Sequence, residues 1–467
     1  MSVPFARQFP VLLVALVASP ASAETRTPIE ETAVEIFREL VQIPSTESGT
    51  GSTPAAQAVE RRLLAAGFAR GDVQVVGPNP RKQNLVARLR GRGSARPILL
   101  LAHLDVVEAR AEDWSKDLPP FQFVERDGYF YGRGTQDIKD GAAILTANLI
   151  RWKQEGWLPS RDLIVALTAD EEGGPDNGVE WLLSQRRELV DAEYGLNTDS
   201  GDFQSKDGRP YIVAFAAAEK KATSMRLEVT NPGGHGSLPR RDNAIYELAA
   251  AIGRVAAFRF PVMPSPLTRL ELERMAALES GEVAADLKAA AAGNADAAAI
   301  ARLSENANYN ALLRTTCVAT QLEAGHAPNA LPQRARAVLN CRILPGHDPK
   351  DVLAGIKQAV ADEKVDVAWQ SIEPETAPPS DLNRDVLGAI ELSAAQLWPG
   401  VAVMPILELG ASDGRLLRAA GIPTYGASGV FLDLGDVRAH GRDERVRVKD
   451  FLGGLAFYDR LLRTLAR

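Results

Sequence analysis

The chain has 467 residues, of which 45% are hydrophobic and 24% are charged, and its formal net charge is −7. A chain of this length has more residues than one compact hydrophobic core usually contains, so we expect two or three structural units. The acidic balance and the lack of a basic stripe exclude nucleic acid as an expected partner. The two cysteines, Cys317 and Cys341, are too few for a disulfide framework or a cysteine-rich zinc site.

The first residues have the pattern of an export signal. Arg7 gives a short positive region, residues 11–17 form an apolar run, and residues 21–23 read Ala-Ser-Ala, a typical cleavage site. The apolar run is too short for a stable membrane span, so an uncleaved anchor is the weaker alternative. We therefore expect a signal peptide at 1–23 and a secreted or periplasmic mature protein that does not contact the membrane.

Helical and strand patterns alternate along the first half of the mature chain. Helices are predicted at 28–41, 53–67, 141–152 and 178–183, and strands at 85–89, 98–102 and 163–167. The strand at 98–102 is continuously apolar, as in a strand covered on both faces. This alternation predicts an α/β domain, a mixed sheet with helices on both faces.

The pattern changes near residue 218. The elements that follow have the order βαββαβ, which predicts an inserted ferredoxin-like domain. The strands are predicted at 224–230, 316–322, 336–343 and 365–372, and the helices at 243–255 and 349–361. An alanine-rich stretch, 284–301, interrupts it as an expected helical arm. A proline-rich link then returns the chain to an α/β pattern that ends in a helix at 448–465. The predicted parts are 1–23, 24–217, 218–373 and 374–467.

An acidic run follows the apolar strand at 163–167. Asp170, Glu171 and Glu172 are succeeded by two glycines, a sequence that packing alone explains poorly. The working hypothesis is that one glutamate holds a metal ion and the other moves protons. Asp170 has no role in this hypothesis beyond a structural one at the turn.

Two further segments place polar groups beside predicted elements. His103 and Asp105 lie two residues apart at a strand end, where a carboxylate commonly orients a metal-binding histidine; a core histidine with an incidental aspartate is the alternative. The glycine-rich segment 132–140 presents Asp137 at the start of a helix. It lacks the third glycine of a dinucleotide-binding loop, so a nucleotide site is not expected. Asp140 in this segment suits a helix cap.

The remaining candidates are one aspartate and four histidines. Asp199 lies in a turn, which is its simplest explanation taken alone. His235 lies among glycines, where an exposed functional histidine is favoured, and His440 precedes the final helix. His326 and His347 lack a carboxylate at a useful spacing, so we expect solvated side chains. Mixed histidine and carboxylate ligands without cysteine suit zinc, or alternatively manganese or cobalt.

The order of these motifs resembles one enzyme family. The motifs H-x-D, G-R-G-T-x-D-x-K, D-E-E-x-G, G-G-H-G-S and A-H-G-x-x-E are similar to those of the di-zinc peptidases and deacylases. That family includes carnosinase-like dipeptidases, carboxypeptidase S, acetylornithine deacetylase and succinyl-diaminopimelate desuccinylase. The resemblance covers nearly all of the mature chain.

The resemblance implies two divalent metal ions per subunit, expected to be zinc, with cobalt or manganese as alternatives. Asp137 would bridge the two ions. His103 and Asp199 would complete one site, and Glu172 and His440 the other.

The resemblance also implies the catalytic groups. Glu171 would be the general base for the water between the metals, and Asp105 would orient His103. The inserted domain would be a lid and dimerisation domain of a homodimer. Its His235 would reach the active site of the partner subunit, contact the substrate and help to stabilise the oxyanion.

The substrate-binding residues implied by the resemblance lie in both predicted domains. Asn329 and Arg342 would bind the substrate, and Arg342 would suit a carboxylate. Ser412 and Gly426 would line the pocket.

The predicted activity is hydrolysis of a peptide bond in small peptides, of dipeptidase or carboxypeptidase type. The alternative is deacylation of N-acyl amino acids; a non-catalytic peptide-binding relative is disfavoured because the non-ligand Glu171 is present.

Two positions depart from the common pattern. Asp140 stands where many members have glycine, and Asp199 where some have glutamate, which favours the dipeptidase-like and carboxypeptidase S-like members over the desuccinylases.

Overall fold

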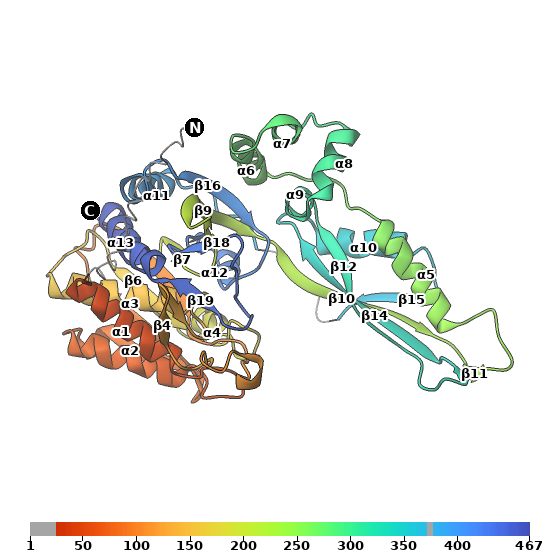
Figure 1. Cartoon of the computed structure of the whole chain (residues 1–467), viewed down its shortest axis with the longest axis horizontal. Helices are drawn as coiled ribbons and strands as arrows, with labels where there is room; N and C mark the ends of the chain where they lie inside the picture. The colour runs from red at the N-terminus through yellow and green to blue at the C-terminus, as the bar shows by residue number, and fades with distance from the viewer. Residues whose placement is uncertain (1–24, 371–376) are drawn as a thin grey trace, which may run out of the picture.

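The computed structural model describes residues 25–370 and 377–467. Figure 1 shows a larger unit, which contains the first and last helices, and an elongated smaller unit joined to it. The predicted signal peptide, residues 1–23, lies outside the described residues. Within the part of the chain that is described, no helix is both long and apolar enough to cross a membrane.

A mixed sheet forms the centre of the larger unit. Its strand order is β1-β2-β6-β3-β7-β17-β9-β8-β18, with β16 paired to β9. The middle strands β6, β3, β7 and β17 run parallel, whereas β1 and β2 are antiparallel to their neighbours. The strands are β1 (Val73–Asn79), β2 (Lys82–Leu89), β3 (Ile98–His103), β6 (Leu163–Thr168), β7 (Tyr194–Asn197), β8 (Phe203–Lys206), β9 (Arg209–Glu219), β16 (Ala402–Glu408), β17 (Thr424–Gly426) and β18 (Phe431–Asp433).

Helices cover both faces of this sheet, as predicted. Leu100 packs in the cluster with α1, α2, α3, α11 and α13, whereas Leu101 packs in the cluster with α4 and α12. Successive strand side chains point to opposite faces, which accounts for this division. The helices are α1 (Pro28–Val41), α2 (Thr53–Ala65), α3 (Lys139–Gln154), α4 (Gly178–Gln185), α11 (Arg384–Leu397), α12 (Gly414–Ala419) and α13 (Val448–Leu465), with a small sheet of β4 (Val124–Arg126), β5 (Tyr129–Tyr131) and β19 (Arg445–Arg447).

The smaller unit is built on a separate antiparallel sheet with strand order β12-β14-β10-β15. The chain enters it at Lys220, between β9 and β10, and its elements follow the order β10, α5, β12, β14, α10, β15. The predicted return near residues 373–374 lies outside the described residues. The elements are β10 (Lys221–Thr230), β11 (Gly234–His235), α5 (Ala244–Ala257), β12 (Thr316–Ala324), β13 (Ala330–Leu331), β14 (Arg334–Ile343), α10 (Pro349–Val360) and β15 (Val365–Trp369).

The alanine-rich stretch is helical, as predicted, and belongs to an arm of four helices between α5 and β12. These are α6 (Pro266–Ala276), α7 (Gly281–Ala292), α8 (Ala297–Glu305) and α9 (Ala307–Leu313). The arm packs on the larger unit, because Arg274 donates to the Val403 carbonyl at 2.6 Å and Glu271 accepts from the Leu407 amide at 2.8 Å. A segment inserted in the smaller unit therefore packs against β16 of the larger unit (Figure 1).

Two features of the smaller unit differ from expectation. Cys317 of β12 and Cys341 of β14 are not part of a framework, but they form one cross-strand disulfide. The prediction of a solvated His347 is wrong: its side chain is buried, its Nδ1 lies 2.7 Å from Thr315 Oγ1, and its ring packs edge-on against Phe260. His326 is exposed, as expected.

Candidate active site

Polar residues gather where three neighbouring parallel strands end. His103 is the last residue of β3, and Asp105 follows it; Glu171 follows β6, and Asp199 follows β7. Because β6, β3 and β7 are parallel neighbours, their carboxyl ends meet at one edge of the sheet. Open α/β sheets bind ligands at this edge.

His103, Asp137 and Asp199 form a first group of ligand atoms. His103 Nε2 lies 3.0 Å from Asp137 Oδ1 and 3.8 Å from Asp199 Oδ1. These three side chains could hold a metal ion together. Asp137 reaches them from the glycine-rich segment that leads into α3.

Asp137, Glu172 and His440 form a second group. His440 Nε2 lies 3.0 Å from Asp137 Oδ2 and 3.0 Å from Glu172 Oε2. Asp137 thus directs one carboxylate oxygen to each histidine, which is the arrangement of a bridging ligand. The structure brings together all five side chains that the sequence predicted as metal ligands.

The charges around these groups fit cations. Burial raises the pKa of Asp199 well above its ordinary value; His103 opposes this shift, and Glu171 and Asp137 add to it. Hydrogen bonds with Asp137 and Glu172 raise the pKa of His440 to about 10. Crowded carboxylates with two imidazoles are a donor set that binds zinc, manganese or cobalt. The residues present therefore fit two divalent ions.

Glu171 belongs to neither group of ligand atoms. Burial, and then the Asp413 carboxylate, raise the pKa of Glu171 to about 8, although His103 opposes this shift. A carboxylate that titrates near neutral pH can both take up and release a proton. Glu171 therefore has the properties expected of a proton carrier, and it lies beside the predicted ligand Glu172.

Asp105 supports the site in a way the sequence did not predict. His103 Nδ1 lies 3.0 Å from the backbone carbonyl of Asp105 and 3.7 Å from its carboxylate. The carboxylate instead accepts the backbone amides of Glu171 at 3.2 Å and Glu172 at 3.0 Å. Asp105 thus contacts His103 through its main chain and holds the Asp-Glu-Glu segment through its side chain.

Glu444 is a supporting residue that the sequence analysis quoted in a motif without assigning a role. Its fully buried carboxylate accepts the backbone amides of Gly134, Gln136 and Asp137 and pairs with Arg133 at 2.6 Å. It therefore fixes the loop that carries Asp137, the predicted bridging ligand. The signal in the sequence was its place at the end of the motif A-H-G-x-x-E, four residues after His440.

Asp170 is structural, as expected. Its buried carboxylate forms an ion pair with Lys82 and accepts the Asp176 amide at 2.9 Å. A cavity of about 320 Å³ lies beside this pair and is also lined by Asp105 and Glu172. The cavity therefore adjoins the predicted metal ligands.

Ser412 and Gly426 were predicted to line the pocket, and both are buried. The Ser412 hydroxyl donates to Glu219 at 2.7 Å and accepts from Asn197 at 2.9 Å, so its hydrogen bonds are already formed within the protein. A side chain at Gly426 would meet Ser200 at 2.5 Å, so the glycine allows a close backbone approach. Contact of either residue with a substrate stays a prediction.

His235, Asn329 and Arg342 are not brought together with the metal-ligand groups. His235 is exposed in β11, beside Asn329, whose carbonyl accepts the Gly236 amide at 2.7 Å. Figure 1 shows β11 at the end of the smaller unit that points away from the larger one. Arg342 is next to the last residue of β14, whereas Asn329 precedes the first residue of this strand. The two residues predicted to bind the substrate together therefore lie at opposite ends of β14.

The fold and the ligand groups define a class, the metal-dependent hydrolases of α/β type. The model of "Peptidase family M20/M25/M40" matches residues 99–464, and the chain belongs to this family of metal-dependent peptidases and amidohydrolases. The chain is thus a hydrolytic enzyme.

Relatives and solved structures are consistent with this membership. N-fatty-acyl-amino acid synthase/hydrolase PM20D1 of Homo sapiens is 28% identical over 379 residues, which cover 79% of this chain and 74% of that protein. Probable carboxypeptidase S-like 2 of Dictyostelium discoideum is 29% identical over 393 residues, covering 79% and 72%. The M20 family metallo-carboxypeptidase Sso-CP2 from Sulfolobus solfataricus superposes with a TM-score of 0.69 at 18% identity, covering 92% and 98%, and so shares the fold.

Proposed function

We propose that this enzyme cleaves the amide bond that joins an acyl or peptidyl group to a C-terminal amino acid. The observation that carries the proposal is the pair of ligand groups that share Asp137, with Glu171 free beside them. The buried Glu171 carboxylate lies beside these groups without belonging to either, so a role in proton transfer suits it better than a role in binding a metal ion. Small peptides, as substrates of a dipeptidase or carboxypeptidase, are the first candidate.

In this proposal, different residues of the chain bind the metal ions and transfer the proton. Two bound divalent ions, with zinc as the first candidate and cobalt or manganese as alternatives, would lower the pKa of a water molecule and polarise the scissile carbonyl. His103, Asp137 and Asp199 would hold one ion, with Glu172 and His440 joining Asp137 at the other. Glu171 takes the proton of the attacking water and delivers it to the leaving nitrogen.

Arg342 supports a substrate with a free carboxylate. Its guanidinium is half-buried and donates to the Asn340 side chain at 3.3 Å, but it forms no ion pair with any described residue. Arginine binds carboxylates through paired hydrogen bonds. An N-acyl amino acid carries the same carboxylate as a dipeptide. Deacylation is therefore the second candidate, favoured by the relative that acts on N-fatty-acyl amino acids.

Matched substrates test both candidates. The mature protein, supplied with zinc, cobalt or manganese, would be assayed with glycyl-leucine, N-octanoyl-leucine and N-octanoyl-leucinamide. We expect release of leucine from one or both of the first two and no cleavage of the third, which lacks the carboxylate. Faster release from glycyl-leucine selects the peptidase, and the reverse result selects the deacylase. Absence of hydrolysis with all three metals would refute the proposal.

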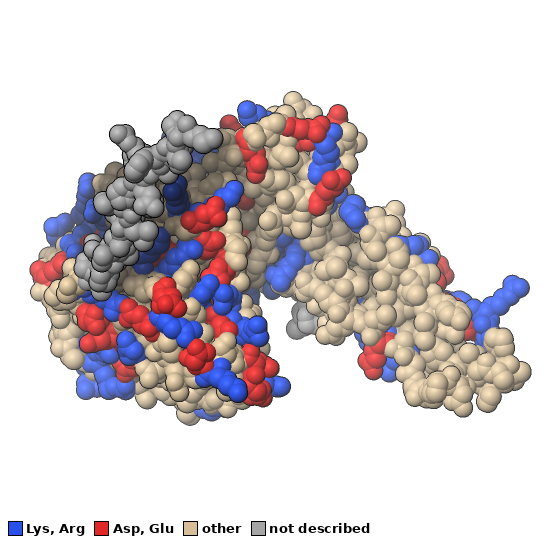
Figure 2. Space-filling view, in the orientation of Figure 1, with Lys and Arg blue, Asp and Glu red and all other residues tan. Residues whose placement is uncertain are grey.

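The smaller unit is proposed to be a ferredoxin-like lid and dimerisation domain of a homodimer. Strand β12 is an edge strand whose last seven residues are exposed, and it carries the apolar side chains Val318 and Leu322. Exposed apolar edge strands tend to pair with another chain. Figure 2 shows that the visible face of this unit is largely uncharged. A dimer would also give His235, at the far end of the unit, a site to act on.

Export of the mature protein is the accompanying proposal. The segment 1–23 has the pattern of a signal peptide, and the Cys317–Cys341 disulfide is typical of an oxidising compartment. We expect the protein from the extracytoplasmic fraction of an expressing cell to begin at Glu24. A mass that retains residues 1–23 would contradict cleavage.

A further inference from the structure

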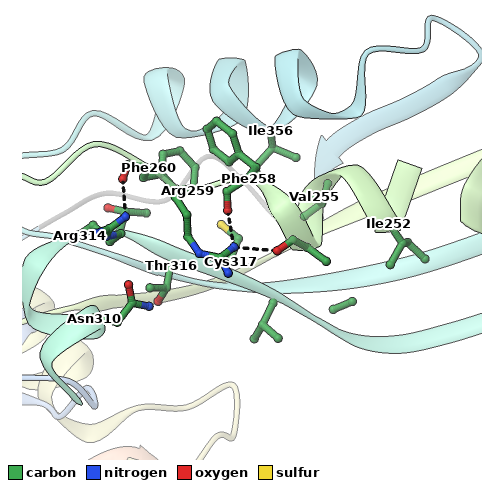
Figure 3. Close-up of a pocket in the computed structure, with 14 residues that line it drawn as sticks. Ile252, Val255, Phe258, Arg259, Phe260, Asn310, Arg314, Thr316, Cys317 and Ile356 are labelled. Carbon is green, nitrogen blue, oxygen red and sulfur yellow. Dashed lines mark hydrogen bonds between the residues drawn. The ribbon is translucent and has the colours of Figure 1, made fainter. Parts of the chain in front are cut away.

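The connection from the larger to the smaller unit begins with two buried charged residues. Glu219 is the last residue of β9, and Lys220 follows it directly before β10. The Lys220 ammonium donates to the Arg314 carbonyl at 2.8 Å, at the end of the helical arm. Figure 3 shows Arg314 beside Phe260, at one end of a cavity in the smaller unit. Lys220 is therefore anchored in the smaller unit.

Glu219 is anchored in the larger unit instead. Its carboxylate accepts the Ser412 amide at 2.9 Å and the Ser412 hydroxyl at 2.7 Å, and it forms an ion pair with Arg418 of α12 at 3.0 Å. None of these three residues is more than 7% exposed. A buried carboxylate with two hydrogen bonds from one residue and a guanidinium beside it is held in one orientation. Glu219 therefore also fixes the direction of the Ser412 hydroxyl.

The Ser412 hydroxyl in turn fixes the amide of Asn197. Because the hydroxyl proton is donated to Glu219, the oxygen acts as an acceptor, and Asn197 Nδ2 donates to it at 2.9 Å. An asparagine amide has one donor end and one acceptor end. With Nδ2 directed at Ser412, Asn197 Oδ1 accepts the backbone amide of Asp199 at 3.1 Å. One hydrogen-bond path thus joins Glu219, Ser412, Asn197 and Asp199.

This path ends on the turn that presents a predicted metal ligand. Asn197 is the last residue of β7, and the Thr198 amide after it donates to the Leu101 carbonyl of β3 at 2.9 Å. Asn197 Oδ1 holds the next peptide, that of Asp199, whose carboxylate lies 3.8 Å from His103 Nε2. Metal sites tolerate shifts of only about 0.2 Å in their ligand distances. Release of this peptide would therefore disturb the first group of ligand atoms.

We propose that Glu219 is a positioning residue for Asp199 and acts through Ser412 and Asn197. This inference rests on the proposed function, in which Asp199 holds a metal ion. It assigns the Ser412 hydroxyl to the hydrogen-bond path and not to the substrate. It also ties one metal ligand to the residue at which the chain leaves the larger unit.

Chelator competition on the cobalt-loaded mature protein tests the inference, with the visible absorption of bound cobalt as the readout. Asp199→Asn and Glu172→Gln first identify which step of cobalt loss belongs to which group of ligand atoms. Ser412→Ala removes only the hydroxyl that links Glu219 to Asn197. It should weaken the step that Asp199→Asn weakens by about 10–100-fold, the usual cost of losing a partner that orients a ligand, and should spare the other step.

Thr315→Val is the matched control. Its buried hydroxyl also has two contacts, because it lies 2.7 Å from His347 Nδ1 and accepts the Leu344 amide at 3.0 Å, but these contacts are all in the smaller unit. The loss of this hydroxyl should lower Tm and leave both steps of cobalt loss unchanged. Weakening of both steps by Ser412→Ala and Thr315→Val alike would reflect a general loss of stability and overturn the inference.

Glu219→Gln interrupts the path at its start, because one end of the glutamine amide is a donor and cannot accept from Ser412. It should weaken the same step of cobalt loss as Ser412→Ala. The double variant should lose no more than the more affected single variant, since both residues act along one path. Losses that multiply in the double variant would show that the two residues act independently, against the inference.

Kinetics separate this inference from the proposed hydrolysis. KM for the better of glycyl-leucine and N-octanoyl-leucine should be unchanged in Ser412→Ala when cobalt is saturating. A raised KM with unaltered cobalt affinity would assign the Ser412 hydroxyl to the substrate and overturn the inference alone. An unmodified protein that binds no cobalt and hydrolyses neither substrate would overturn the inference together with the proposed function.

Discussion

The carboxyl edge of the large sheet and the far end of the smaller unit carry the two halves of one predicted site. At the sheet edge, side chains from three strand ends and two loops form two groups whose ligand atoms lie within 4.8 Å of one another, and the site is crowded with charge. At the far end, His235 is exposed and its Nδ1 is 2.7 Å from Ser237 Oγ, within its own loop. The first region is already assembled, whereas the second has no reacting group beside it.

A single chain therefore holds only one of these two halves in a working arrangement. The edge has what it needs to hold two cations and move a proton. The oxyanion donor predicted at His235 lies on a separate unit that points away from it (Figure 1). In the proposed homodimer, the partner subunit would supply this donor. Substitutions in each region can therefore test the two halves separately.

The largest effect is expected at Glu171. Glu171→Gln should lower kcat by about 10²–10⁴-fold, because the carboxylate is the proposed proton carrier, and should leave the bound metal unchanged. Glu172→Gln is the comparison, since it removes a ligand and should also lower the metal content. The metal content and kcat of both variants would be measured on the same preparations. Full turnover in Glu171→Gln would sink the base assignment.

A smaller loss is expected at the far end of the smaller unit. His235→Ala should lower kcat by about 10²–10³-fold, the usual cost of losing one oxyanion donor. If His235 acts across a dimer, mixing this variant with Glu171→Gln should restore about a quarter of the sites, because half of randomly mixed dimers are heterodimers with one intact site. No recovery despite demonstrated subunit exchange would count against action in the partner subunit.

The local sequence predicted the sheet edge well, because motifs at strand ends carry their geometry with them. His103 and Asp199 follow apolar strands, and parallel neighbours bring such ends together. The sequence did not reveal how Asp105 divides its contacts, since its carboxylate reaches amides that are distant in the sequence. It also did not predict β9, whose register with β16 and β17 is set only by the assembled sheet.

The smaller unit shows the same limit. Its strands and helices were predicted from periodicity, but periodicity does not say which side chains face each other. The pairing of Cys317 with Cys341 depends on the register of β12 and β14, and the burial of His347 depends on Phe260, which is remote in the sequence. The packing of the alanine-rich arm on β16 also could not be predicted from the sequence. A high alanine content predicts a helix, but it does not indicate which element the helix packs against.

A substitution that disturbs the position of Asp137, the predicted bridging ligand, should have an intermediate effect. Glu444→Gln weakens the acceptor for three backbone amides and leaves Arg133 without its charge partner, so the metal affinity should fall by about 10–100-fold. Competition with a chelator measures this. Asp443→Asn is the matched control, because the neighbouring Asp443 bonds to Ser115 instead. Equal affinities in both variants would show that the loop does not need Glu444.

The smallest effect concerns the arm that links the smaller unit to β16 of the larger one. Burial raises the pKa of Glu271 to about 8 from an ordinary 4.5, with the Leu407 amide opposing and Glu408 adding to the shift. The folded protein therefore keeps the Glu271 proton between about pH 4.5 and 8, where the unfolded chain has lost it. The stability from this group is complete below about pH 4.5 and is lost as the pH rises toward 8.

Glu271→Gln should remove that part of the pH dependence, since glutamine can still accept from the Leu407 amide without ionising. The difference in Tm between the variant and the unmodified protein should grow by a few degrees in favour of the variant between pH 5.5 and 8, as measured by calorimetry. The matched control is Glu273→Gln, an exposed site on the same helix, which should show no such trend. A difference in Tm that stays constant over this range would show that Glu271 does not titrate on unfolding, and that the arm is held on β16 without a protonated carboxyl group.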